Sequence, residues 1–454
     1  METILIKIAQ VVAAFAILII LHEGGHFLFA KLFKIRVEKF YLFFDAWDIR
    51  LFRWPRKKKS PDQTEYGIGW LPLGGYVKIA GMIDESMDTQ QMKQEPQPWE
   101  FRTKPAWQRL LVMLGGVIVN FITAFVIYMG ILFIWGNSYI RPTDMTYGLK
   151  FNEEAISHGF RNGDIICKTD DKVIKEWDGN VLRDIANADE VTILRENREV
   201  TLKMPAKQNM LEMATSNPPY AQMLLPLQID SILPESPAQQ AGLHKGDVIT
   251  QINDTPIDDF NDLAYQLSVF ATSLNQESTA ADSLRLRTIT LVVNHADTLH
   301  AVLTPDFTLG FVNKSLDYKV TTDHYNILQS IPAGFKYGWE QLGNYVNDLK
   351  YLFTAQGAKS VSGIVGITNI FPDTWDWQRF WRLTALLSIA LGVMNVLPIP
   401  ALDGGHAIFA IYEIITRRKP SEKVLIRAQY IGFILLIALM IFATWNDIVR
   451  ILGL

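Results

Sequence analysis

The sequence predicts a helical membrane protein with four spans and one large extramembrane insert. Four apolar stretches, separated by polar sequence, are the basis of this prediction: residues 4–30, 110–135, 383–400 and 424–445. A helical span needs about 20 apolar residues, and only the third stretch is short and ends in prolines. Residues 137–376 have the composition of an ordinary water-soluble chain and form the predicted insert.

Composition excludes several other classes. The chain has 454 residues and a net charge of −4, which predicts no nucleic-acid partner. A cleaved signal peptide fits residues 4–30 poorly, because this stretch lacks a basic start and contains His-Glu-Gly-Gly-His. Cys167 is the single cysteine, so no intramolecular disulfide can form and the insert must be stabilised by its own core.

Basic residues follow the first span and also separate the third span from the fourth. Lysine and arginine are enriched in cytoplasmic loops, so both loops are expected in the cytoplasm. Both termini and the insert then face the outer side. The residues concerned are Lys31, Lys34, Arg36, Lys39, Arg50, Arg53, Arg56, Lys57, Lys58, Lys59, Arg417, Arg418, Lys419 and Lys423.

The first span contains the motif H-E-x-x-H, as His22-Glu23-Gly24-Gly25-His26. This spacing places two imidazoles on one helix face, where they can bind zinc, with the glutamate as general base. Ionisable groups at membrane depth are costly and usually functional. The two glycines cost roughly 1 kcal/mol each relative to alanine, and they indicate close helix packing or access to the backbone.

A second polar cluster at membrane depth supplies the missing ligand. Catalytic zinc usually has three protein ligands and one open position. The segment Asn395-Val396-Leu397-Pro398-Ile399-Pro400-Ala401-Leu402-Asp403-Gly404-Gly405-His406 offers Asp403, and its prolines break the helix where the backbone can line a cavity. His406 competes for the ligand role, since it lies three residues after Asp403; otherwise it is a supporting or purely structural side chain.

The insert contains an internal repeat. Residues 159–166 (GFRNGDII) match residues 242–249 (GLHKGDVI), an offset of 83 (242 − 159). A helix-like segment and a strand pair follow each copy, with Asn197 and Asn294 at the turns. Each copy resembles a PDZ domain, a module that accepts peptides by strand addition. A rigid spacer or size filter is an equally good interpretation of the tandem.

The two motifs and the PDZ-like tandem together resemble the site-2 protease family of intramembrane zinc metalloproteases, bacterial RseP type, over nearly the whole chain. The resemblance implies that His22, His26 and Asp403 hold one catalytic Zn²⁺, that Glu23 activates water, and that Asn395 holds the substrate or the oxyanion. Pro398, Pro400 and Gly404 would shape this site. A membrane-associated β-hairpin is expected at about residues 64–82, where Gly74, Gly75 and Tyr76 would bind an unwound substrate; a loop that only plugs the cytoplasmic face is the alternative.

Five segments follow from this interpretation. Residues 1–136 hold the first two spans and the β-hairpin, residues 137–208 and 222–306 the PDZ-like domains, and residues 376–454 the last two spans. Residues 323–375 form an amphipathic connecting helix and loop, which lies on the outer membrane surface or packs on the PDZ-like domains.

The resemblance implies an endopeptidase of the bacterial inner membrane, with both termini and the tandem on the periplasmic side and the active site toward the cytoplasm. Its substrates would be single-span membrane proteins such as anti-sigma factors, trimmed first by a site-1-type protease, and remnant signal peptides. A non-catalytic PDZ membrane scaffold predicts loss of the metal-binding residues, yet all are present. A zinc transporter needs more polar residues along its spans than Asn120 and Thr123 of the second span. We therefore predict a protease.

Overall fold

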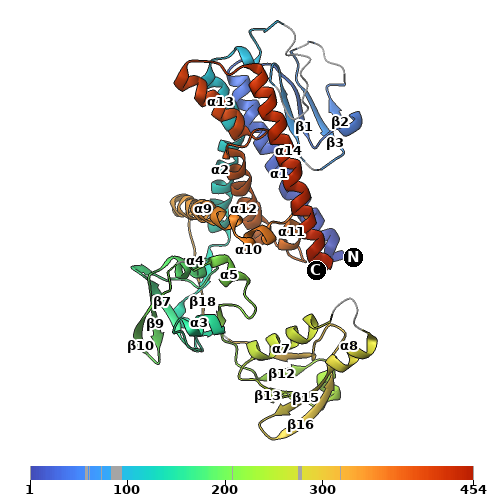
Figure 1. Ribbon diagram of the computed structural model, residues 1–454, viewed down its shortest axis with the longest axis vertical. Coiled ribbons are helices and arrows are strands. Elements are labelled where there is room, and N and C mark those ends of the chain that lie inside the picture. Colours follow the sequence, from blue (N-terminus) through green and yellow to red (C-terminus); the bar gives the residue numbers. More distant parts are fainter. Residues whose placement is uncertain are drawn as a thin grey trace. The chain divides into compact units, whose positions relative to one another are not determined.

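A computed structural model describes residues 2–56, 60, 62–72, 74–82, 95–206, 208–274, 279–316 and 318–452. Lys57, Lys58 and Lys59 of the predicted basic loop, and Leu73 of the predicted β-hairpin, lie outside the described residues. The chain forms two compact units (Figure 1). The first combines Met1–Asn137 with His324–Leu454, and the second is Ser138–Asp323.

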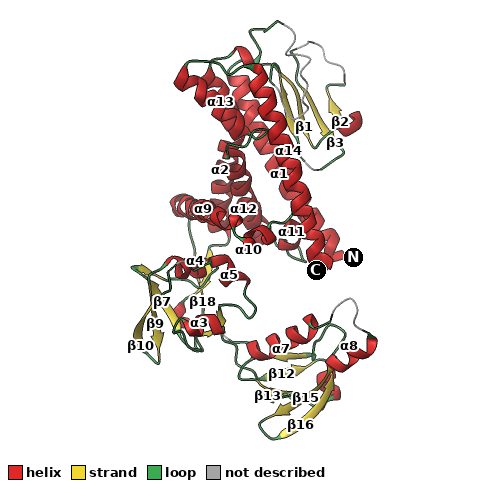
Figure 2. Ribbon diagram, viewed as in Figure 1, coloured by secondary structure: helices red, strands yellow, loops and turns green. Residues whose placement is uncertain are grey.

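Long helices form the frame of the first unit (Figure 2). Among the described residues, three helices are long and apolar enough to cross a membrane: α1 (Glu2–Leu32), α2 (Ala106–Ile134) and α14 (Glu422–Leu452). At about 1.5 Å per residue each is about 45 Å long, which exceeds the roughly 30 Å of hydrocarbon in a bilayer. Most large apolar side chains of α14, such as Ile431, Ile434 and Ile441, are exposed, as expected of a helix that faces lipid.

The predicted third span is a broken helix. α12 (Trp377–Val396) and α13 (Asp403–Thr416) are separated by a non-helical turn, because Pro398 cannot continue a helix and restricts the residue before it. Arg379 and Arg382 in the first two turns of α12 lower its hydropathy, and it is not among the three span candidates. α12 buries Ala385 and Ile389 in a shared core with α2.

The expected β-hairpin is wrong in its pairing. The strands β1 (Val37–Leu42), β2 (Arg50–Trp54), β3 (Glu65–Gly69) and β4 (Tyr76–Ile79) form one sheet in the order β2-β3-β1-β4. β3 pairs with β1 in parallel and β4 pairs with β1 antiparallel, so β1 separates the two strands that were expected to pair. β1 holds this central position because it buries Val37 and Tyr41. Among the described residues, β4 is an edge strand of this sheet.

Three helices lead from the second unit's end back to α12: α9 (Ile327–Asp348), α10 (Ala355–Ser360) and α11 (Ile364–Ile370). α9 packs along α2, where Gly334 and Gly338 allow close approach. A Cβ atom at Gly334 would lie 2.6 Å from the backbone of Met129. The amphipathic connecting segment is therefore anchored on a membrane-length helix of its own unit.

The second unit contains two α/β lobes, each with its own hydrophobic core. The first lobe comprises β5 (Asn137–Ile140), β6 (Leu149–Phe151), α3 (Glu153–Ser157), β7 (Ile165–Thr169), β8 (Lys172–Val173), α4 (Asn180–Asn187), β9 (Glu190–Arg195), β10 (Arg198–Lys203), α5 (Met210–Thr215) and β11 (Ala221–Met223). The second comprises β12 (Ile229–Ile232), α6 (Pro237–Gln240), β13 (Ile249–Ile252), β14 (Thr255–Pro256), α7 (Phe260–Thr272), α8 (Ala280–Arg287), β15 (Thr288–Val293), β16 (Asp297–Val302) and β17 (Phe311–Asn313), after which β18 (Val320–Asp323) pairs with β5.

The lobes repeat each other in topology and in detail. The sheet β10-β9-β7-β8 corresponds strand for strand to β16-β15-β13-β14. Gly163 and Gly246 have φ angles of 93° and 94°, values that favour glycine. The next residues, Asp164 and Asp247, both accept a hydrogen bond from the backbone N–H three residues earlier. Both cores extend past residues 208 and 306, since they include Met213, Tyr220, Phe307 and Leu309.

Candidate metal centre

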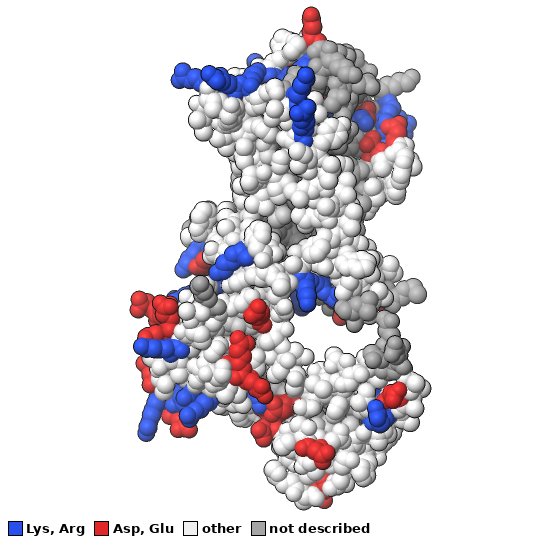
Figure 3. All heavy atoms as spheres, in the orientation of Figure 1, with Lys and Arg blue, Asp and Glu red and all other residues white. Residues whose placement is uncertain are grey.

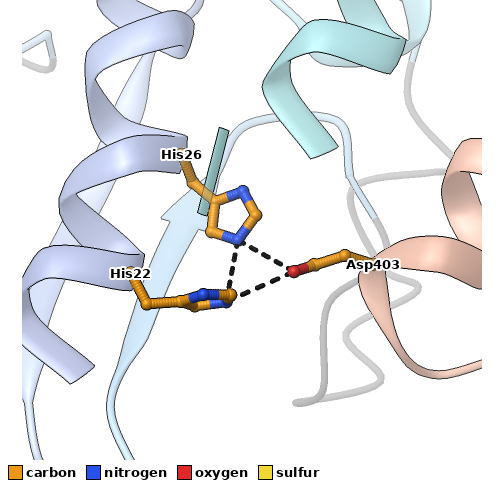
Figure 4. Close-up of side chains that lie close together, drawn as sticks. All are labelled: His22, His26 and Asp403. Carbon is orange, nitrogen blue, oxygen red and sulfur yellow. Dashed lines mark hydrogen bonds and ion pairs between the residues drawn. The ribbon is translucent and has the colours of Figure 1, made fainter. Parts of the chain in front are cut away.

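Three side chains from two distant parts of the chain converge in the first unit (Figure 4). His22 and His26 project from one face of α1, and Asp403 begins α13. The two Nε2 atoms are 3.2 Å apart, and Asp403 Oδ2 lies 3.2 Å from His22 Nε2 and 3.3 Å from His26 Nε2. The three form a candidate metal-binding group in which both histidines are buried.

The donor set fits zinc. Tetrahedral zinc with bonds of about 2.0–2.1 Å separates its ligand atoms by roughly 3.3 Å, close to the spacing of these three atoms. Asp403 Oδ2 is buried, and apart from its close contacts with the two imidazole nitrogens it accepts no hydrogen bond from any described residue, although a buried carboxylate oxygen normally needs one. Two neutral imidazoles and one carboxylate are also ligands that zinc prefers, and three protein ligands leave a fourth position open.

Each imidazole is held through the nitrogen that faces away from the triad. His26 Nδ1 lies 2.8 Å from the carbonyl oxygen of Val112, and His22 Nδ1 lies 3.0 Å from the side-chain amide of Asn120. Both partners come from α2, and Asn120 is completely buried. A hydrogen bond that Nδ1–H donates leaves the Nε2 lone pair free for a metal, and His26 meets this condition because its partner is a carbonyl oxygen.

Glycines bring α1 and α2 close enough for these contacts. A Cβ atom at Gly25 would overlap the carbonyl oxygen of Gly115, and one at Gly116 would lie 2.6 Å from His22 Cε1 and His26 Nε2. Small residues at such crossings let backbones approach closely in membrane proteins. A Cβ atom at Gly24 would have no described atom within 4 Å, so packing among the described residues does not explain this glycine.

Glu23 and Asn395 line a cavity of about 580 Å³ together with the triad. Asn395, near the end of α12, places its amide Nδ2 3.4 Å from His22 Nε2. Val77, in the edge strand β4, lines this cavity together with Glu23. A carboxylate, an amide and a strand edge therefore border the same space as the triad.

The predicted β-segment also reaches this cavity. Gly75 and Tyr76 line it, whereas Gly74 packs on the ring of Phe44. The Tyr76 hydroxyl donates to Asp45 (2.9 Å), and Lys39 Nζ lies 3.3 Å from the same carboxylate. Burial alone would raise the pKa of Asp45, but the hydrogen bond from Tyr76 and the charge of Lys39 hold this pKa below its usual value. The part of the cavity wall that these residues form is thus polar and charged.

The residues predicted to shape the site, which lie between α12 and the first turn of α13, differ in how deeply they are buried. Gly404 is buried, and a Cβ atom there would overlap the carbonyl oxygens of Val396 and Leu397. Pro398 is exposed and Pro400 is partly buried. His406 lines the cavity but does not belong to the group of three ligand atoms.

Sequence reasoning missed the role of α2. Asn120 was noted only as a polar residue of the second span, and Gly115 and Gly116 were not singled out. The available signal was a lone amide inside an apolar span, which usually marks a functional position. A single sequence does not reveal which face of the span the amide occupies.

A His-His-Asp group with both histidines buried, beside a glutamate and among membrane-length helices, is typical of membrane-embedded zinc metallopeptidases. The profile of Peptidase family M50 matches residues 10–439, and the chain belongs to this family, as an RseP-type site-2 protease.

Relatives resemble the chain over nearly their full lengths. The Protease RseP of Yersinia pestis is 29% identical, over 99% of this chain and 100% of the relative. The Regulator of sigma-E protease RseP of Escherichia coli (strain K12) is 27% identical over the same shares. A Thermotoga maritima protein named "Putative zinc metalloprotease" is 24% identical, over 96% of this chain and 97% of its own length. The protein is thus a zinc-dependent metalloendopeptidase and a multi-pass membrane protein.

Proposed function

We propose that this endopeptidase cleaves single-span membrane proteins within the bilayer, at one zinc ion held by His22, His26 and Asp403. The observation that carries the proposal is the mutual spacing of 3.2–3.3 Å among three ligand atoms, of which Asp403 Oδ2 accepts no further hydrogen bond from the described residues. A complete ligand set argues against a non-catalytic scaffold, which would have no need to keep it.

Each residue has a distinct role in the proposed chemistry. Zinc, when bound, lowers the pKa of water and polarises a carbonyl. Glu23 accepts the proton from the attacking water and returns it to the leaving amine. Asn395, whose amide lies beside His22, donates a hydrogen bond to the substrate carbonyl as negative charge develops on its oxygen.

The substrate must unwind before cleavage, because a helix hides its carbonyls. The free edge of β4 borders the cavity through Gly75, Tyr76 and Val77, and an extended segment can pair with it. Residues 76–79, rather than a hairpin, therefore form the proposed substrate-binding edge.

We further propose four spans, with α12 as the third, in the bacterial inner membrane. The loop between α13 and α14 carries Arg417, Arg418 and Lys419, and basic side chains gather at that end of the first unit while the adjoining helical surface is largely uncharged (Figure 3). This distribution supports a cytoplasmic position for that end and for the metal centre. The two chain termini, at the other end of the same helices, would then be periplasmic.

The two lobes of the second unit are proposed to be tandem PDZ-like domains on the periplasmic side that act as a size filter. The substrates would be anti-sigma factors trimmed first by a site-1-type protease, and remnant signal peptides. A bulky untrimmed outer domain could not pass such a filter.

The Glu23→Gln variant tests the proposal. Loss of the general base should lower cleavage of single-span proteins by about 10²- to 10⁴-fold, while bound zinc stays at one ion per chain. Quantitative membrane proteomics of cells with the wild type or the variant should show trimmed single-span fragments that accumulate only with the variant. Undiminished turnover by Glu23→Gln would refute the general-base role, and the absence of such fragments would refute the substrate class.

A further inference from the structure

A buried glutamine on α14 faces the catalytic cavity without a partner. Gln429 is 7% exposed, and its side chain has no hydrogen bond within the described part of the chain. It lines both the cavity of about 580 Å³ and a neighbouring one of about 80 Å³. His406 on α13 lines the same two cavities and likewise has no side-chain hydrogen bond to any described residue. His406 is partly exposed, whereas Gln429 is buried as a residue. Because a buried side-chain amide is normally hydrogen-bonded, Gln429 indicates a position where a ligand in the cavity can bind.

The packing of α14 directs Gln429 toward the cavity. Gly432, one turn further along, lies so close to the carbonyl oxygen of Pro400 that a Cβ atom there would overlap it. Residues three and four apart share a helix face, and Phe433 also lines the cavity. Gln429 therefore lies on the same face of α14 as Gly432, the face that packs against the turn after α12.

An extended substrate would need hydrogen bonds on both of its edges. The N–H and C=O groups of alternate residues point to opposite sides of a strand, and only one side can pair with β4. The other side would face a cavity lined by apolar groups such as Leu402 and Phe433, where unsatisfied backbone groups are costly. A glutamine amide offers one acceptor and two donors, which match a peptide unit.

We propose that Gln429 and His406 form hydrogen bonds with the free edge of the unwound substrate, opposite the edge that pairs with β4. The inference rests on the proposed function, in which the substrate extends along β4. These hydrogen bonds involve only backbone groups of the substrate, so they can form with substrates of different sequence. They also lower the cost of keeping a substrate strand extended in a site that lipid surrounds.

Binding of a defined extended probe to the full-length, zinc-loaded protein tests the proposal. The probe is fluorescently labelled Ala-Leu-Ala-Leu-Ala-Leu-hydroxamate, and its dissociation constant is measured by fluorescence anisotropy. Gln429→Met keeps the size of the side chain but removes its hydrogen bonds, and it should weaken binding about tenfold. His406→Leu should act in the same direction. Tyr430→Phe, on the adjacent and exposed position of α14, is the control and should bind as the wild type does.

Ester replacements in the probe separate this proposal from the pairing with β4. Each ester removes one backbone N–H. In the wild type, esters at two adjacent residues should both weaken binding, since one N–H faces β4 and the next faces α14. In the Gln429→Met variant, only the ester at the residue whose N–H faces β4 should still weaken binding of the probe. An unchanged affinity of Gln429→Met, equal ester effects in both proteins, or loss of zinc from the variant would overturn the proposal. A wild type that is insensitive at the β4-facing residue would instead refute the pairing with β4.

Discussion

At the scale of single residues, the orientation of Asn120 decides whether His22 can bind a metal. With Nδ2 placed 3.0 Å from His22 Nδ1, the oxygen of the same amide is buried without a partner. Exchanging the two ends of the amide, which have nearly the same shape, lets Oδ1 accept a hydrogen bond from Nδ1–H. The Nε2 atom of His22 is then free for the metal. The ligand geometry therefore selects one of the two amide orientations.

Replacing Asn120 with leucine should weaken zinc binding about 10- to 100-fold, because the His22 ring loses the partner that fixes its tautomer and orientation. The measurement is competition with a graded series of chelators, followed by metal analysis of the protein. Thr384→Val is the matched control, since Thr384 is equally buried and its hydroxyl donates to the carbonyl oxygen of Phe380 in its own helix. Equal zinc affinity of Asn120→Leu and the control would show that Asn120 has no role in ligand positioning.

At the scale of elements, the crossing of α1 and α2 explains why position 25 of the H-E-x-x-H motif is glycine, but it does not explain the glycine at position 24. Gly25 meets the backbone of Gly115, whereas nothing lies near a Cβ at Gly24. The sequence indicated close packing for the pair but could not assign it to one position, because the partner helix lies some 90 residues away (115 − 25 = 90).

Gly25→Ala and Gly24→Ala should therefore have opposite effects. Alanine at position 25 forces α1 and α2 apart, which should lower the melting temperature and the zinc occupancy together. Alanine at position 24 meets no atom and should stabilise the helix by up to about 1 kcal/mol. Thermal unfolding in detergent and metal content measure both effects. Similar behaviour of the two variants would contradict the close crossing at Gly25.

The β-sheet shows where element prediction failed. Residues 37–42 and 50–54 were treated only as parts of a basic loop, because Lys39, Arg50 and Arg53 dominated the interpretation. Lys39 and Arg50 instead bond to Asp45, so their charges are paired inside the sheet. Apolar and polar residues do not alternate regularly in Val37–Leu42, so this segment lacks the usual strand signal, and one sequence does not specify which strands pair.

At the scale of the whole molecule, local patterns and the repeat were predictable and long-range placement was not. The H-E-x-x-H spacing, the proline break before Asp403 and the 83-residue repeat can all be read within one segment each. Gln429, Asn120 and the Gly25–Gly115 contact depend on which helix faces lie together, information that only tertiary packing supplies. Apolar spans hide it further, because their lipid-facing and core-facing sides have similar composition.

The two units can be separated to test the proposed filter. β5 and β18 pair at the start and end of the second unit, with Ser138 Oγ 2.8 Å from Thr322 Oγ1, so its ends lie side by side. Replacing residues 138–323 with a short Gly-Ser linker should leave the core and metal centre of the first unit intact, with zinc content unchanged. The deletion variant should cleave a trimmed single-span substrate at a rate within about tenfold of the wild type, a difference of roughly 1.4 kcal/mol in barrier. It should also cleave the untrimmed substrate, which the intact protein should reject if the second unit is a filter. If a zinc-loaded deletion variant still rejected the untrimmed substrate, the second unit would not be the filter, and selection would have to occur at the cavity beside β4 and α14.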